Sequence, residues 1–303
     1  MRKVLLIFML IYFGIILFTN AQNDIYSRLF YFNQGMFNPA ATGLESKNFL
    51  TSNFSSWWNK IENHPSRLNF GYERTFDKIN SSAAAYYYYS QSGNLTNTNT
   101  IGISYSYKFK FSDIHFLKLG VQLNLNRLFI NFSLLDHHLG DPCLSSGKES
   151  GTKPDINVGI WYSWKKLSIG ASIVNVFRPV LIPYSASCSS EYEGVKLPGY
   201  LTFTAKYEIR LSSNFNLTPA IYYFSYSNFS LDFDYLDYGI NLGYKKIVNF
   251  GTIYAPESVS EWTVFAGVKI IKKINIQLSY GFPDKDLWNI GPNIEALVSY
   301  AIN

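Results

Sequence analysis

The feature that most constrains this chain is a strict alternation of apolar and polar residues, repeated from Phe49 to the carboxy-terminal end. Between Ile101 and Phe111 every odd residue is apolar, whereas the residues between them are Gly, Ser or Lys. A period of two places successive side chains on opposite faces of a β-strand. The pattern recurs with similar clarity in residues Leu117–Asn126, Leu201–Arg210 and Ile274–Tyr280. The chain is therefore predicted to be all-β, with strands that have one apolar and one polar face.

The lengths of the connections between these segments also follow a rule. About fourteen segments lie between Phe49 and Ile302, and no stretch has the period of a long amphipathic helix. Connections after even-numbered segments are short, near Asp77–Ser81, Ser112–Ile114, Lys165–Lys166, Leu211–Ser213, Lys245–Lys246 and Lys272–Lys273. Connections after odd-numbered segments are longer, at Asn59–Pro65, Gln91–Asn97, Leu128–Lys153, Phe177–Lys196, Pro256–Ser260 and Pro283–Asn289, with a short join near Ser227–Asn228 as the exception. Short periplasmic turns and longer extracellular loops are typical of an antiparallel outer-membrane β-barrel.

A soluble β-sandwich or propeller is the alternative, because its strands alternate too. Neither fold gives a reason for connection length to follow strand parity. The chain is 18% aromatic and only 16% charged, whereas ordinary globular proteins carry about 25% charged residues. Aromatic residues also gather at segment ends, where a barrel places its interfacial girdle; the candidates are Trp57, Trp58, Trp164 and Trp262. We therefore expect the apolar face to contact lipid and the polar face to line the barrel interior.

The amino-terminal residues predict export from the cytoplasm. Arg2 and Lys3 precede an apolar run from Val4 to Phe18, and small residues up to Ala21 favour signal-peptide cleavage before Gln22. An uncleaved membrane anchor is the alternative, but the apolar run is short for one. We predict a signal peptide over 1–21, a periplasmic amino-terminal segment over 22–48 and the barrel over 49–303. The middle segment could plug the lumen, contact a periplasmic partner or pack as a tether under the barrel.

The sequence offers no candidate catalytic residue, cofactor site or metal site. It contains no nucleophile elbow, no phosphate-binding loop and no H-E-x-x-H motif. The cluster of Asp136, His137, His138, Asp141 and Cys143 is the nearest approach to a metal site, but adjacent histidines in an extended loop point apart. Removing Arg2 and Lys3 lowers the net charge from +5 to +3, and the remaining basic residues are scattered. This argues against nucleic-acid binding.

Two cysteines, Cys143 and Cys188, lie in the two longest connections. A disulfide persists in an exported protein, so a Cys143–Cys188 bridge would stiffen these loops. Two free thiols are equally compatible with the sequence.

The run from Tyr31 to Gly43, YFNQGMFNPAATG, resembles the amino-terminal signature of the PorP/SprF family. In that family an aromatic lead ending in N-P runs into an N-P-A-x-x-G box after the signal peptide; here the two overlap. The residues that match the box are Asn38, Pro39, Ala40 and Gly43. The closing residues Glu295–Tyr300 also resemble the family's last strand, although Asn293 and Ile294 depart from its pattern.

This resemblance implies an outer-membrane component of the type IX secretion system of gliding and periodontal Bacteroidetes-like bacteria. It implies binding rather than catalysis, with the barrel as a scaffold or surface anchor for a large adhesin or other secreted protein. The implied partners are outer-membrane lipid, a secreted protein with a type IX carboxy-terminal domain, and other secretion components. The alternative is an outer-membrane channel for small or hydrophobic solutes, because a barrel of about fourteen strands is wide enough for a lumen.

Overall fold

The computed structural model describes residues 27–134, 147–182, 194–225, 229, 235–256, 258–271 and 273–302. The predicted signal peptide, the cluster at residues 136–143 and both cysteines lie outside the described residues, so these predictions are not tested. The described chain contains no helix that is long and apolar enough to cross a membrane.

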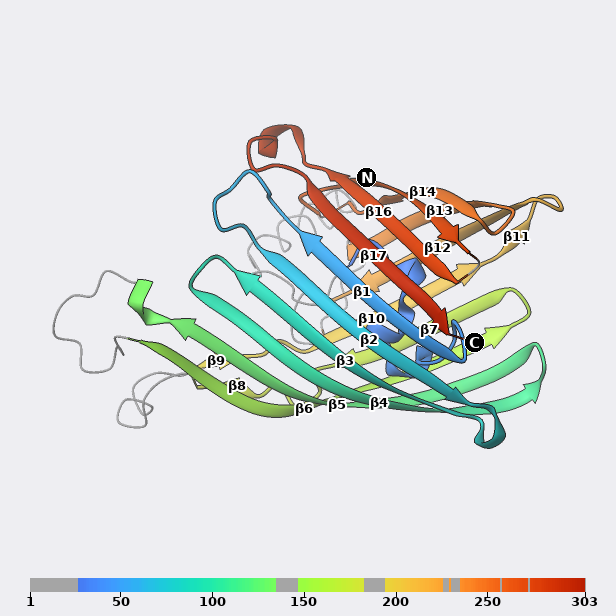
Figure 1. Cartoon of the computed structure of the whole chain (residues 1–303), viewed down its shortest axis with the longest axis horizontal. Coiled ribbons are helices and arrows are strands. Elements are labelled where there is room, and N and C mark those ends of the chain that lie inside the picture. The colour runs from blue at the N-terminus through green and yellow to red at the C-terminus, as the bar shows by residue number, and fades with distance from the viewer. Residues whose placement is uncertain are drawn as a thin grey trace, which may run out of the picture.

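Fourteen antiparallel strands form a closed barrel, which confirms the predicted fold (Figure 1). Each strand pairs with its neighbour in the chain, β17 pairs with β1, and β10 pairs with β12. β10 and β11 are one barrel strand interrupted at Glu208. The strands are β1 (Asn48–Ser56), β2 (Ser66–Phe76), β3 (Ser81–Ser92), β4 (Thr96–Ser112), β5 (His115–Asn131), β6 (Lys148–Trp164), β7 (Leu167–Val174), β10 (Tyr200–Tyr207) with β11 (Ile209–Arg210), β12 (Phe215–Phe224), β13 (Leu236–Tyr244), β14 (Val248–Tyr254), β15 (Trp262–Ile270), β16 (Ile274–Phe282) and β17 (Asn293–Ile302).

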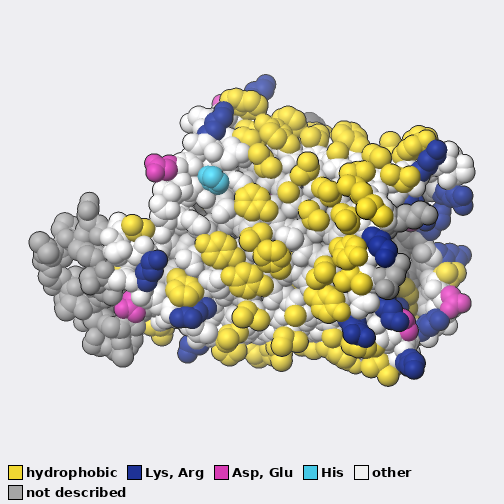
Figure 2. Space-filling model, viewed as in Figure 1, with side chains coloured by type: hydrophobic (Ala, Val, Ile, Leu, Met, Phe, Trp, Pro, Cys, Tyr) yellow, Lys and Arg dark blue, Asp and Glu magenta, His cyan; other side chains and the backbone are white. Residues whose placement is uncertain are grey.

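The apolar face of these strands points outward, as the alternation predicts. In β4, Ile103 is 65% exposed, whereas its neighbour Ser104 is buried in the interior. Figure 2 shows a broad apolar area over the middle of the face in view. An apolar outer band with a polar interior is the arrangement of a membrane barrel. Closure also gives every strand two neighbours, so no strand edge is left unpaired in lipid.

Short connections gather at one end of the barrel, which we call the turn end, and long ones at the other, which we call the loop end. The turn-end connections comprise residues 77–80, 113–114, 165–166, 211–214, 245–247 and 271–273. The loop-end connections include residues 57–65, 132–147, 175–199, 225–235, 255–261 and 283–292. In outer-membrane barrels the short turns face the periplasm, so the loop end faces outward from the cell.

One predicted connection is wrong. The expected long loop at Gln91–Asn97 is a three-residue turn, because β3 continues to Ser92 and β4 begins at Thr96. Gly93 has a φ of +64°, which allows this tight turn, and the polar residues around it extend both strands. The short join predicted near Ser227–Asn228 lies outside the described residues, so this prediction is not tested.

The remaining described elements are short. Three single-turn 3-10 helices lie in the amino-terminal segment: η1 (Phe30–Phe32), η2 (Gln34–Met36) and η3 (Pro39–Ala41). Others occupy connections: η4 (Asp77–Ile79), η5 (Phe132–Leu134) and η7 (Lys285–Leu287). A two-stranded sheet of β8 (Val180–Leu181) and β9 (Val195–Lys196) lies in the connection between β7 and β10.

Candidate functional site in the barrel lumen

Residues 27–47 lie inside the barrel, and we call them the lumen segment (Figure 1). Leu29 and Phe30 in this segment have no exposed surface. Ser27 contacts Glu295 near the loop-end terminus of β17. Gly43 contacts Thr75 near the turn-end terminus of β2. The segment therefore runs lengthwise through the lumen, and its first described residue is the one nearer the loop end.

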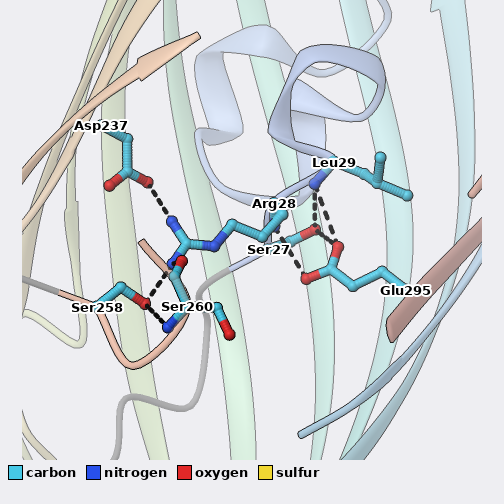
Figure 3. Close-up of polar contacts among 7 residues, drawn as sticks. All are labelled: Ser27, Arg28, Leu29, Asp237, Ser258, Ser260 and Glu295. Carbon is cyan, nitrogen blue, oxygen red and sulfur yellow. Dashed lines mark hydrogen bonds and ion pairs between the residues drawn. The ribbon is translucent and has the colours of Figure 1, made fainter. Parts of the chain in front are cut away.

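A single carboxylate binds the first residues of the lumen segment (Figure 3). Glu295, on the inner face of β17, accepts hydrogen bonds from the Ser27 hydroxyl at 2.7 Å, the Arg28 amide at 2.9 Å and the Leu29 amide at 3.2 Å. The carboxylate is 1% exposed. Charge-assisted hydrogen bonds of this kind are about twice as strong as neutral ones, so Glu295 fixes the backbone of the segment at this point.

The Arg28 side chain reaches another part of the wall, four strands away from β17 (Figure 3). Its Nη1 lies 3.1 Å from Oδ2 of Asp237 on β13. Its Nη2 donates to the Ser258 hydroxyl and, at 3.2 Å, to the Ser260 carbonyl in the connection between β14 and β15. Removing one partner of a buried ion pair leaves an uncompensated charge, which costs about 3–5 kcal/mol. Arg28 thus ties the lumen segment to two further elements of the barrel.

Aromatic side chains that follow Arg28 in the lumen segment pack against aromatic side chains of the barrel wall. The Phe30 ring stacks on the ring of Tyr222 from β12, with 4.6 Å between centroids. Tyr31 packs against Phe265 from β15 at 5.6 Å, and Phe37 meets Tyr222 edge-on at 6.3 Å. Such pairs add about 0.5–1.5 kcal/mol each beyond the burial of their area. The lumen of this barrel therefore has a hydrophobic core made partly by the chain's own amino-terminal segment.

The residues of the predicted family motif, Asn38, Pro39, Ala40 and Gly43, also contact the barrel wall. Asn38 caps η3, because its Oδ1 accepts the Ala40 amide at 2.9 Å. Its Nδ2 donates to the Ile160 carbonyl at 3.0 Å and to the Ala171 carbonyl at 3.1 Å, on β6 and β7. Pro39 occupies the first position of η3, where its missing amide hydrogen costs nothing. One asparagine side chain therefore joins the local turn to two barrel strands.

Glycines in the barrel wall make room for the motif. A Cβ at Gly120 on β5 would lie 2.2 Å from the Ala40 nitrogen and 2.3 Å from the Pro39 carbonyl carbon. Both obstacles are backbone atoms, which cannot move without displacing the segment. The glycine at this position lets the Pro39–Ala40 backbone approach the wall closely.

The end of the motif is held by buried charges near the turn end. Gly43 has a φ of +76°, and its amide donates to Glu73 on β2. Tyr86 on β3 also donates to Glu73, at 2.9 Å. Lys118 on β5 donates to the Thr42 carbonyl. The acid on β2 and the base on β5 thus bind the N–H and the C=O of a single peptide group, the one between Thr42 and Gly43.

The buried charges are the part of the site that sequence reasoning missed. Glu73, Lys118, Asp237 and Glu295 are buried charged side chains of the barrel, and each contacts the lumen segment. Their signal in the sequence is a charged residue among Asn, Ser and Thr on the inward face of a predicted strand. Nothing in the local pattern tells such a residue from one that contacts water.

The other predicted site residues lie at the two ends of the barrel. Trp164 is exposed at the turn-end terminus of β6, and Trp262 is exposed at the loop-end start of β15. Trp57 and Trp58 begin the connection between β1 and β2, and the guanidinium of Arg67 lies 4.7 Å from the Trp57 ring centroid. The interfacial girdle stays a prediction. In the described part of the chain, no group of three or more His, Cys, Asp or Glu residues could hold a metal ion.

Comparison with solved structures agrees with the fold. The CymD monoaromatic hydrocarbon channel is 12% identical, with a TM-score of 0.51 over 88% of this chain and 91% of that chain. The toluene transporter TbuX of Ralstonia pickettii is 14% identical, with a TM-score of 0.50 over 88% of this chain and 92% of that chain. At these identities the likeness shows the barrel fold alone.

Comparison with family models gives a more specific result. No curated protein matches the chain. The family described as "Type IX secretion system membrane protein PorP/SprF" matches residues 19–300. This match covers the lumen segment and nearly the whole barrel, and it confirms the resemblance seen in the sequence. The chain is therefore an outer-membrane β-barrel that belongs to the PorP/SprF family of type IX secretion components.

Proposed function

We propose that this barrel is a scaffold or surface anchor for a large secreted protein that carries a type IX carboxy-terminal domain. The observation that carries the proposal is the lumen filled by residues 27–47 and fixed there by four buried charges. A barrel filled in this way provides a rigid wall. Other type IX secretion components, including periplasmic ones, are its further partners.

The contacts of the lumen segment favour a closed barrel over a channel. Opening a continuous path would break the Glu295 bonds, the Arg28–Asp237 ion pair and the aromatic core at the same time. The free energies of these contacts add to several kcal/mol by the usual magnitudes. The fold and the family are those of a secretion or outer-membrane protein and of no known enzyme class.

A channel for small or hydrophobic solutes is the second candidate. CymD and TbuX are named as a hydrocarbon channel and a toluene transporter, and this chain shares their barrel fold. A cavity of about 330 Å³ at the turn end, beside Tyr31 and Phe32, is the observation in this structure that favours it. Such a cavity would be one part of a solute path.

The anchor is tested by deleting the gene and measuring two outputs. We expect the deletion to abolish surface display of one large secreted protein, detected on intact cells by antibody labelling, and re-expression to restore it. Uptake of small solutes should not change. Normal display of the secreted proteins, with loss of solute flux in liposomes, would overturn the proposal in favour of the channel.

The closed lumen is tested separately by conductance in planar bilayers. We compare the full mature chain with a variant that lacks residues 27–44. The full chain should show no sustained current, whereas the deletion variant should conduct, because its lumen then holds water. Equal, sustained conductance in both proteins would contradict a barrel closed by its own segment.

A further inference from the structure

The two ends of the barrel differ in charge. In the part of the chain that the structure describes, the basic residues of the turn-end connections are Lys78, Lys165, Lys166, Lys245, Lys246 and Lys273, all of them exposed. The acidic residues there are Asp77 and Asp113, and Asp113 pairs with Lys110 at 2.6 Å. The described loop-end connections are balanced, with Lys60, Arg178, Lys196 and Lys285 against Glu62, Glu261, Asp284 and Asp286. On the face shown in Figure 2, Lys and Arg side chains gather at the turn end, which is the basic end of the barrel.

The lipid-facing residues continue up to the turns without a polar margin. The last outward residues of β4, Phe109 and Phe111, are exposed, and the strand ends at Ser112. At the other end of β4 the apolar band stops at Ile101, and the outward positions 97 and 99 are asparagines. The edge of the hydrocarbon layer therefore lies at the turns themselves. This places the turn residues at the depth of the phospholipid headgroups.

The turn-end connections also expose large aliphatic side chains. These residues are Ile79, Ile114, Leu211, Ile247 and Ile271, each more than half exposed and Ile271 as much as 78%. Apolar side chains beside lysines are the combination that binds an anionic lipid surface, because the apolar groups enter the acyl boundary while the ammonium groups stay among the headgroups. The chemistry of the turns therefore fits a membrane interface.

Two of the turn-end lysines lie over aromatic residues of the lipid-facing wall. Nζ of Lys165 is 5.2 Å from the ring centroid of Trp164, and Nζ of Lys245 is 5.2 Å from that of Tyr244. Both rings are exposed at the turn-end termini of β6 and β13. A lysine over such a ring keeps its charge at the headgroup level, where lipid phosphates lie. These two ammonium groups are therefore placed at the outer wall of the barrel.

The geometry of the turns does not explain these lysines. Lys165, Lys245 and Lys246 have φ angles of +54°, +49° and +56°. This left-handed conformation is unfavourable for most L-residues, and tight hairpin turns favour Gly or Asn in it. Asn80 adopts it, with a φ of +51°, in the connection between β2 and β3. Asparagine at the three lysine positions would therefore keep the turns and remove only the charges.

We propose that the turn end of the barrel binds anionic phospholipid headgroups of the periplasmic leaflet. Lys165 and Lys245 bind lipid phosphate at the outer wall, and the exposed aliphatic side chains of the turns contact the adjoining acyl chains. An acidic protein surface would match the charge of the turns, but it would not match aliphatic side chains at the edge of the lipid-facing band. The inference goes beyond the anchor role and does not depend on it.

The test measures lipid binding by the purified, delipidated mature chain in detergent, using native mass spectrometry. The probes are phosphatidylglycerol, which is anionic, and phosphatidylcholine, which has no net charge. The turn-end variant combines Lys165→Asn, Lys245→Asn and Lys246→Asn. The matched control removes three charges at the loop end, by Lys60→Asn, Lys196→Asn and Lys285→Asn. Electrophoretic mobility checks that each barrel is folded.

We expect the wild type to bind phosphatidylglycerol at least tenfold more tightly than phosphatidylcholine, because each lysine near an anionic headgroup contributes about fivefold. The turn-end variant should lose most of this preference, and the control should stay within twofold of the wild type. Equal affinity of the wild type for both lipids would overturn the proposal, and so would an unchanged preference in the turn-end variant. If the wild type instead bound polyglutamate through these lysines, without preferring phosphatidylglycerol, the occupant would be an acidic polypeptide. Surface display tests the anchor independently, so failure here leaves the anchor intact.

Discussion

Glu295→Ala is the most informative single substitution in this barrel. Glu295 accepts hydrogen bonds from Ser27, Arg28 and Leu29. The substitution deletes these bonds and leaves the Arg28 amide without an acceptor, whereas the Leu29 amide keeps the Ser27 hydroxyl oxygen at 3.2 Å. The Arg28–Asp237 ion pair and the aromatic core are not touched. We therefore expect the first residues of the lumen segment to detach locally while the barrel stays folded.

The magnitude follows from the number of donors that lose their acceptor. Each buried donor left without a partner costs about 1–3 kcal/mol. The Ser27 hydroxyl can rotate to another partner and the Leu29 amide keeps a second acceptor, so the Arg28 amide sets the cost at about 2 kcal/mol. Because 1.4 kcal/mol is a factor of ten, the population with residues 27–29 detached should rise about thirtyfold.

Limited proteolysis measures the population with residues 27–29 detached. Arg28 is buried in the folded protein, so trypsin can cut the Arg28–Leu29 bond only in the detached state. When reclosing is fast, the cutting rate follows the population of the open state. The product that begins at Leu29 is quantified by mass spectrometry in detergent. Glu295→Gln, which keeps one carbonyl oxygen as an acceptor, should give an intermediate rate.

The control is Ser299→Ala, which removes a buried hydroxyl on the same face of β17 without touching Glu295. It should leave the cutting rate at the wild-type value. A Glu295→Ala rate within threefold of the wild type, with the barrel still folded, would refute the reasoning. Residues 27–29 would then be held by the aromatic core and the ion pair alone.

Two further substitutions test the family motif. Gly120→Ala places a methyl group 2.2 Å from the Ala40 nitrogen, so the folded barrel should be less stable. On electrophoresis its folded, fast-migrating form should disappear at a temperature several degrees below that of the wild type. Gly281→Ala, whose nearest neighbour would be at 3.0 Å, should change this temperature less, and equal shifts would contradict the close approach. Asn38→Ala removes a cap and two hydrogen bonds, at a cost of about 2–4 kcal/mol, and hydrogen exchange at the Ala40 amide should speed up accordingly. Asn38→Asp should be worse, because its oxygen would face the Ile160 and Ala171 carbonyls; exchange as slow as in the wild type would show that the two donors do not matter.

The barrel itself could be predicted because its signal is local. Ile103 and Ser104 face opposite sides simply because they are neighbours in a strand. The parity of connection lengths then distinguishes a barrel from a sandwich. The wrong connection at Gln91–Asn97 shows the limit of this signal. Beyond the apolar band, strands such as β3 and β4 become polar on both faces and read as a loop, although Gly93 turns the chain tightly.

The motif residues could be found from family likeness, but their role could not. Asn38 in the sequence is a polar residue before a proline. Its bonds to Ile160 and Ala171 join residues separated by more than 120 positions. The fit also needs a glycine at position 120 on another strand. No local pattern contains such a relation.

The sequence by itself determined the barrel architecture and the location in the outer membrane, because period-two alternation and turn spacing are properties of residues close together in the chain. Only the tertiary structure decided that residues 27–47 fill the lumen and that Glu73, Lys118, Asp237 and Glu295 bind them. The physical reason is that lumen contacts form only after the barrel closes. Closure brings Ser27 to Glu295 across 268 positions and Arg28 to Asp237 across 209. The role of a charged residue on the inner face of a strand therefore depends on the segment that it contacts there.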